Sequence, residues 1–349
     1  MAEDGDAVEI DAFLKSLGAT DDQVTDAWAD RHVARLAGDL VFAQGATLTA
    51  RDLASRSGTS VGDVLSIWRT LGVVVPDEDH PMFAEGDAEL TGFFVGSNPV
   101  SPHGDELLRV LGSSLARVAE AAVSVYVQTQ EPAYDSPEPD LLAWAREQAA
   151  VSAAALRLGD SMGSVFAHHM RDAIDRQRLA QEDVSDPSLH RLAVGFVDLV
   201  GFTPLTLHTS PASLLELVGT FEDRAFGVAS SHHGRIVKHI GDEVMFVAPS
   251  AASGCAIAWD ITTSLGSGIE PRGGVCYGDV ISRHGDYYGP VVNMASRLAD
   301  LAIPREVLVD AATVRSAKGA FEFRPAGNRL LKGFEDPVEV HSIGAVLAG

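Results

Sequence analysis

The spacing of apolar residues changes near residue 190, and this change constrains the fold more than any other feature of the chain. From about residue 8 to residue 180, apolar residues recur at three- and four-residue intervals, as in 107–128 and 140–158, which predicts helices. From residue 190 onward, short β-rich runs alternate with helical runs in the order βαββαβ. We therefore predict an α+β chain, in which an all-α part precedes a ferredoxin-like sheet with helices on one face.

Composition and charge exclude several classes of protein. The chain has 349 residues, of which 46% are hydrophobic and 21% charged, as expected of two globular domains. Of the net charge of −23, residues 1–185 carry −18 and residues 186–349 carry −5, so we expect no nucleic-acid partner. Two cysteines and an acidic N-terminus without a signal-like apolar run indicate the cytoplasm. No apolar run reaches membrane-spanning length, while peripheral membrane association is left open.

Residues 48–74 are typical of a helix-turn-helix, with two short helical runs separated by a glycine-containing turn. The second run, VGDVLSIWR, offers one arginine and no basic cluster. This favours helical packing or subunit contact over DNA reading. A helix-turn-helix regulator that carries a sensing domain is the alternative.

Two aspartates are predicted at the tips of neighbouring strands. Asp198 ends an apolar run and precedes a glycine-containing turn, and Asp242 lies beside Gly241 in a tight turn between two short strands. Carboxylates are the ligands that hard cations prefer, and helix-start N–H groups suit phosphate oxygens. The pair therefore indicates a two-metal site next to phosphate.

Four further polar residues have spacings that suit a purine nucleotide. Lys238 and Asp286 together supply a donor and an acceptor, which match the ring nitrogen and exocyclic amine of adenine. Asn293 and Arg297 lie four residues apart on one helical face, where both can stabilise charge on a phosphoryl group. Each residue, taken alone, is equally typical of a solvated surface.

Three short runs together resemble the motifs of the class III adenylate and guanylate cyclases: FVDLVGFT, KHIGDEVM and DYYGPVVNMASR. The likeness spans about residues 190–343. It implies that Asp198 and Asp242 hold two Mg²⁺ or Mn²⁺ ions per active site, with the Leu199 carbonyl as a backbone ligand. In the first motif, Phe202 and Thr203 are expected to contact the substrate.

The same resemblance implies roles for the other residues. Lys238 and Asp286 fall on the adenine-selecting positions, which points to ATP as substrate and cyclic AMP as product. Asn293 and Arg297 fall on the transition-state pair, and Lys332 falls on a lysine that contacts the triphosphate. Guanylate cyclases of this family usually carry glutamate and cysteine at the base-reading positions.

Family members build each site from two subunits, so the resemblance implies a homodimer with two composite active sites. The first 185 residues resemble the regulatory half of actinobacterial pH-sensitive adenylate cyclases in length, helicity and position. We accordingly predict a regulatory domain at 1–159, a transducer helix at 160–185 and a catalytic domain at 186–349. The apolar helices of the first part suit a fatty-acid pocket as well as a dimerisation bundle.

Two other functions remain open from the sequence. A guanylate cyclase differs only in base selection. A catalytically silent nucleotide-binding signalling module would keep the fold and lose turnover, although intact metal and transition-state residues favour an enzyme.

Overall fold

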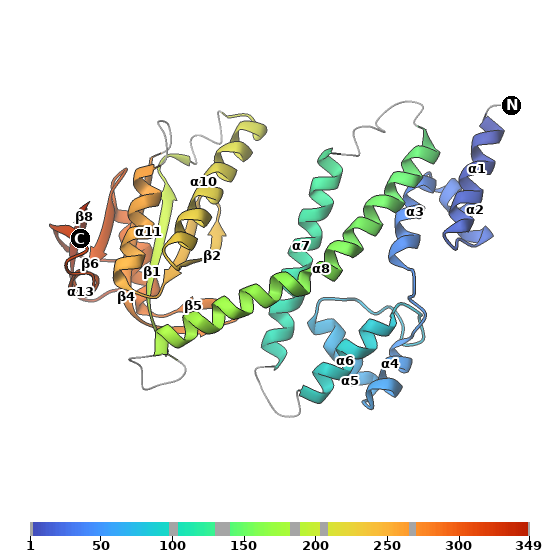
Figure 1. Ribbon diagram of the computed structural model, residues 1–349, viewed down its shortest axis with the longest axis horizontal. Helices are drawn as coiled ribbons and strands as arrows, with labels where there is room; N and C mark the ends of the chain where they lie inside the picture. Colours follow the sequence, from blue (N-terminus) through green and yellow to red (C-terminus); the bar gives the residue numbers. More distant parts are fainter. Residues whose placement is uncertain are drawn as a thin grey trace. The chain divides into compact units, whose positions relative to one another are not determined.

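The computed structural model describes residues 3–97, 104–129, 140–181, 189–202, 209–264 and 270–347. The chain divides into two compact units, residues 1–168 (the first unit) and residues 169–349 (the second unit). Figure 1 shows helices alone in the first unit and strands with helices in the second. The α+β prediction is therefore confirmed. The predicted domain boundaries stay predictions, and residues 182–185 of the transducer helix lie outside the described residues.

The first unit is all-helical, as predicted, and several of its helices begin at side chains that cap them. Thr20, Thr49 and Ser60 each accept a hydrogen bond from the backbone three residues on, and the residue there bonds back to the cap. Such reciprocal bonds satisfy backbone groups that a helix start leaves unpaired. The helices are α1 (Glu3–Ser16), α2 (Asp21–Ala29), α3 (Val33–Phe42), α4 (Ala50–Ser57), α5 (Val61–Thr70), α6 (Glu85–Ser97), α7 (Gly104–Thr129) and α8 (Leu141–Gln181).

Two apolar clusters form the core of the first unit. One joins α1, α2 and α3 to Ala145 of α8, and the other joins α4, α5, α6 and the start of α7. The predicted pair of short helices at 48–74 is present as α4 and α5, with Gly58 in the left-handed conformation that ends α4. The predicted helices at 140–158 and 160–183 form one helix, α8, which crosses from the first unit into the second.

Helix α7 leaves most of its apolar side chains exposed. Val118, Val123 and Val127 are between 41% and 57% exposed, so a single described chain does not enclose them around a lipid. By length and composition α7 is the one described helix that is long and apolar enough to cross a membrane. Length and composition alone do not establish a span, because core helices pass the same test.

The second unit contains one mixed sheet whose described strands run in the order β2-β3-β1-β4-β6-β8-β7, with β5 paired to β4. Neighbouring strands are antiparallel except β4 and β6, which are parallel. The strands are β1 (Leu189–Leu199), β2 (Arg235–Ile240), β3 (Glu243–Ala248), β4 (Pro271–Arg283), β5 (Asp286–Tyr288), β6 (Val307–Asp310), β7 (Phe321–Arg329) and β8 (Val338–Val346). The helices are α10 (Pro211–Ser231), α11 (Ala251–Ser264), α12 (Pro290–Leu301) and α13 (Ala311–Ser316).

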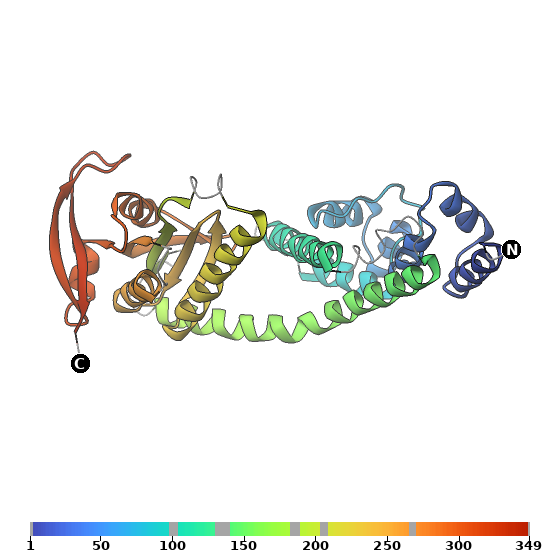
Figure 2. The ribbon, with the colours of Figure 1, turned by 90° about the horizontal axis from the view of Figure 1, so that it is seen from above.

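Helices cover both faces of the sheet, so the prediction of helices on one face was wrong. Because side chains alternate along a strand, Ala193 and Val197 of β1 pack under α10 and α11, while Val194 and Phe196 pack under α12. Figure 2 shows helices on the two sides of the sheet. β1 is buried on both faces, and its nearly continuous apolar run reflects this.

Gly274 of β4 allows α12 to pack closely on the sheet. A Cβ atom there would lie 2.3 Å from both the Ala295 carbonyl oxygen and the Ala299 amide nitrogen. Backbone atoms cannot move aside as a flexible side chain can. The small residues of α12 and this glycine together set the position of the helix.

We predict that Gly274→Ala lowers the free energy of unfolding of the second unit by about 2 kcal/mol, because overpacking displaces α12. Urea titration of the wild type and the variant measures the change. Gly227→Ala in α10 is the control, since a Cβ there meets nothing within 4 Å, and helix propensity makes it neutral or slightly stabilising. Equal stability of Gly274→Ala and wild type would contradict the packing argument.

Candidate active site

Asp198 and Asp242, predicted at neighbouring strand tips, do lie at one place. Asp198 is the second-last residue of β1, and Asp242 lies in the turn between β2 and β3, where Gly241 takes a φ of +67°. Burial raises the pKa of the Asp242 carboxyl, and the charge and hydrogen bonding of Asp198 raise it further. The Asp198 carboxyl group therefore lies close enough to Asp242 to oppose ionisation of Asp242.

Two residues at this place were not singled out from the sequence. Glu243 lies directly across from Asp198 in the β1–β3 pairing, and Arg272 lies across from Asp198 in the β1–β4 pairing. Burial and the carboxylates of Asp198, Asp300 and Asp242 raise the pKa of Glu243 to about 7.

Arg272 partly balances this negative charge. Its Nε and Nη2 atoms donate to Asp198 Oδ2 at 3.1 and 2.9 Å, and its Nη1 donates to the Asp300 carbonyl oxygen at 2.6 Å. Both side chains of the Arg272–Asp198 pair are three-quarters or more buried. One arginine thus holds Asp198 and the end of α12 together.

The carboxylates at this place fit a divalent cation. Three acidic side chains lie near a single arginine. Burial is the largest cause of the raised pKa values of Asp242 and Glu243, and the neighbouring carboxylates raise them further. Hard cations take carboxylate and carbonyl oxygens as ligands. Within the described ranges, however, no group of three or more His, Cys, Asp or Glu side chains is gathered around a metal position. Any further ligands must come from the backbone or the substrate, and the Leu199 carbonyl stays a prediction.

Lys238 and Asp286 also lie together, as the adenine-reading hypothesis requires. Lys238 Nζ lies 2.5 Å from Asp286 Oδ2, and Asp286 Oδ1 accepts a hydrogen bond from the Tyr287 amide at 2.8 Å. These residues come from β2 and β5, 48 residues apart in sequence. A positively charged donor and a carboxylate acceptor therefore lie side by side, and both are partly buried.

Asn293 and Arg297 are carried by α12, which starts at Pro290 directly after Gly289. Asn293 is exposed, and Arg297 Nη1 donates to Asp300 Oδ2 at 3.0 Å. In the described contacts of one chain, Arg297 meets Asp300 rather than Asp198 or Asp242. The pair shares a helix face as predicted, and its side chains are not joined to the two aspartates.

The remaining predicted residues have different surroundings. Lys332 is exposed between β7 and β8, next to buried Leu331. Phe202 is partly buried against the cluster under α10 and α11, and Thr203 lies outside the described residues.

Comparison with known proteins adds to this geometry. Residues 184–345 match the model of the adenylate and guanylate cyclase catalytic domain. An adenylate cyclase of Glutamicibacter nicotianae is 31% identical over 82% of this chain and 76% of its own length. A pH-sensitive adenylate cyclase of Mycobacterium tuberculosis is 29% identical over 89% of this chain and 82% of its own. The adenylyl cyclase CyaB structure from P. aeruginosa is 23% identical with a TM-score of 0.42, over 46% of this chain and 96% of its own.

The excess charge predicts how stability depends on pH without a bound cation. The Glu243 pKa rises from 4.5 to about 7 on folding, so the folded chain holds a proton that the unfolded chain releases. Stability contributed by this group is therefore lost as pH rises from about 4.5 to about 7. In EDTA, Glu243→Gln should raise the melting temperature at pH 8 and leave it nearly unchanged at pH 5. A difference of the same size at both pH values would contradict the assignment.

Proposed function

The chain belongs to the class III adenylate and guanylate cyclase family, and on that premise we propose that it is an adenylate cyclase, which converts ATP to 3′,5′-cyclic AMP and pyrophosphate. The observation that carries the choice of ATP is the contact between Lys238 and Asp286. The ammonium group donates to a ring nitrogen of adenine, and the carboxylate accepts from its exocyclic amine. Guanine presents a carbonyl where adenine has that amine, so the carboxylate would repel it. The adenylate cyclase names of the similar proteins agree with this choice.

Asp198 and Asp242 are proposed to hold two Mg²⁺ or Mn²⁺ ions, for which their shared excess charge provides the attraction. Such ions, when bound, neutralise the triphosphate and lower the pKa of the ribose 3′-hydroxyl. Arg272 supports the same half of the site, because its contacts fix the Asp198 carboxylate.

The 3′-oxygen attacks the α-phosphorus, and pyrophosphate leaves. Asn293 and Arg297 are proposed to stabilise the charge that develops on the α-phosphoryl group, as hydrogen-bond donors from one helix face. Lys332 is proposed to steady the leaving phosphates as a mobile point charge. Phe202 and Thr203 follow the first aspartate and are proposed to position the substrate.

A homodimer with two composite sites is proposed because, in the described contacts of one chain, the donors of α12 do not meet Asp198 or Asp242. Arg297 contacts Asp300, and Asn293 and Lys332 are exposed, so these donors suit a substrate held by a second chain. Each chain would supply both halves, one to each site.

The N-terminal helices are proposed to regulate this activity. Helix α8 runs without a break from Leu141 to Gln181 and is the covalent connection between the two units. A change in the first unit can reach the second through a continuous helix more directly than through a flexible linker. The pH-sensitive relative is consistent with pH as the stimulus.

We predict that the purified chain with Mn²⁺ favours ATP over GTP in kcat/KM by about a hundredfold, since a site built for one hydrogen-bond pattern rejects the reverse pattern. The double variant Lys238→Glu with Asp286→Cys should reverse this preference by at least about tenfold. Separation of the cyclic nucleotide products measures both rates. Lys318→Glu repeats the Lys-to-Glu part of this change at an exposed position outside the site and should keep the preference for ATP. A double variant that still prefers ATP would contradict the assignment of Lys238 and Asp286 as base-reading residues.

The composite site predicts complementation between inactive variants. Asp198→Ala and Arg297→Ala should each abolish activity, yet random mixing should restore about a quarter of it, since half the dimers then have one of two sites intact. Asp198→Ala mixed with Asp242→Ala should restore nothing, because both changes affect the acidic half. Recovery in both mixtures, or in neither despite heterodimer formation, would contradict the shared site.

A further inference from the structure

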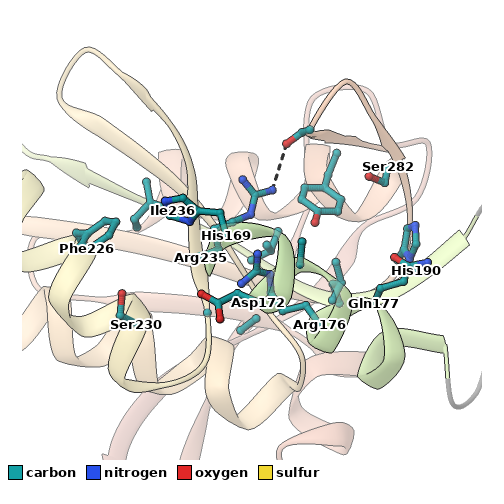
Figure 3. Close-up of a pocket in the computed structure, with 17 residues that line it drawn as sticks. His169, Asp172, Arg176, Gln177, His190, Phe226, Ser230, Arg235, Ile236 and Ser282 are labelled. Atoms are coloured by element: carbon teal, nitrogen blue, oxygen red, sulfur yellow. Dashed lines mark hydrogen bonds between the residues drawn. The ribbon is translucent and has the colours of Figure 1, made fainter. Parts of the chain in front are cut away.

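The second unit contains a cavity of about 600 Å³ between residues 169–177 of α8 and the sheet (the α8–sheet cavity). His169, Asp172 and Arg176 of α8 line it together with His190 of β1 and Arg235 of β2, and Figure 3 labels these side chains. His190 precedes Asp198 by eight residues along β1, about 27 Å of extended strand. The α8–sheet cavity is therefore separate from the metal aspartates.

The charge of this cavity is opposite to that of the chain. Arg176 and Arg235 line it against one carboxylate, that of Asp172, whereas the whole chain carries a net charge of −23. Among the described side chains of 163–178, Arg176 is the one that is not exposed. Burial and the positive charge of Arg235 lower the pKa of Arg176. Two guanidinium groups that face each other in a partly buried space repel each other, and an anion between them removes that repulsion.

The surroundings of the two arginines suit phosphate oxygens. Arg235 donates to the Gly285 carbonyl oxygen at 3.1 Å and lies 5.7 Å from the centre of the Tyr287 ring, so its guanidinium is held in place. Ser230 and Ser282 add hydroxyl donors to the lining, and His169 and His190 add ring nitrogens. Guanidinium groups bind phosphate through paired hydrogen bonds, which a preordered arginine provides at low entropic cost.

We propose that the α8–sheet cavity binds a phosphoryl anion between Arg176 and Arg235, and that the anion holds the end of α8 against the sheet. The source is either inorganic phosphate or the phosphate of a small nucleotide, for which Phe226 and Ile236 provide an apolar wall. Arg235 lies three residues before Lys238, and Tyr287 follows Asp286. An effect of the anion on base reading rests on the proposed function, whereas the binding itself does not.

Binding is tested on the full chain in EDTA, without turnover, by calorimetry and thermal shift with inorganic phosphate and with adenosine 5′-monophosphate. Potassium chloride at equal ionic strength corrects for screening. Arg176→Met and Arg235→Met should each raise the Kd at least tenfold. Arg178→Met is the matched control, because Arg178 lies on the same helix, is exposed and pairs with Asp175. Its Kd should equal that of wild type.

A charge reversal separates loss of binding from loss of folding. Arg176→Glu places a carboxylate opposite Arg235, so the variant should be at least as stable as wild type without phosphate and should no longer respond to it. Tighter binding of the nucleotide than of phosphate would identify the nucleotide as the source, and equal binding would identify free phosphate.

The proposal is overturned if phosphate binds with unchanged affinity to Arg176→Met and Arg235→Met, or if Lys332→Met alone abolishes binding. The second result would place the anion at the catalytic site. No step of the test needs ATP turnover. If phosphate does not bind at the α8–sheet cavity, the cyclase assignment is unaffected. If the enzyme is inactive but still binds phosphate there, the anion site is unaffected.

Discussion

The pairing of β1 with β3 on one side and β4 on the other fixes the charges on which the active site depends. This register places Asp198 opposite Glu243 and opposite Arg272, while the adjacent β2–β3 turn adds Asp242. The acidic residues stay close together because β1 is buried on both faces, so its position relative to its neighbours is fixed. The raised pKa values are the cost of that arrangement in the absence of a cation. The same carboxylates are the groups proposed to hold the metal ions of a metal–nucleotide.

The sequence was sufficient to predict the position of residues whose signal lies within a few neighbouring residues. Asp198 and Asp242 were predicted at neighbouring strand tips because apolar runs and a Gly-Asp turn are visible within a few residues. Lys238 and Asp286 were predicted to read one adenine edge together. The structure brings the two side chains into contact, and their base-reading role stays a proposal. Arg272 was not singled out, because its partner is 74 residues away and only the register of β1 with β4 brings them together.

Three features of the fold were not predicted: the strand β7, the face of the sheet that α12 covers, and the continuity of α8. Much of β7 is exposed and its PAG turn-like sequence breaks the alternation, so it gains its strand structure from pairing with β8 rather than from local preference. α12 was predicted as a helix. The face of the sheet on which it packs depends on which face Gly274 of β4 presents to it, and the strand register sets that face. Likewise α8 shows no strong break at Gly159 or Gly163, since a glycine weakens a helix without ending it.

The position of the α8–sheet cavity determines which part of catalysis an occupant can influence. β2 is the edge strand of the sheet and carries an irregularity in its pairing between Ile236 and Lys238. Strand β5 is three residues long and pairs only with β4 in the described sheet. Arg235 and Tyr287 lie on these two strands, and so do Lys238 and Asp286. An edge strand with one neighbour is easier to displace than β1, which has two. On the proposed function, contacts at the cavity would therefore act on base reading by Lys238 and Asp286 rather than on Asp198 and Asp242. Regulation through α8 would then change KM for ATP before it changes metal binding.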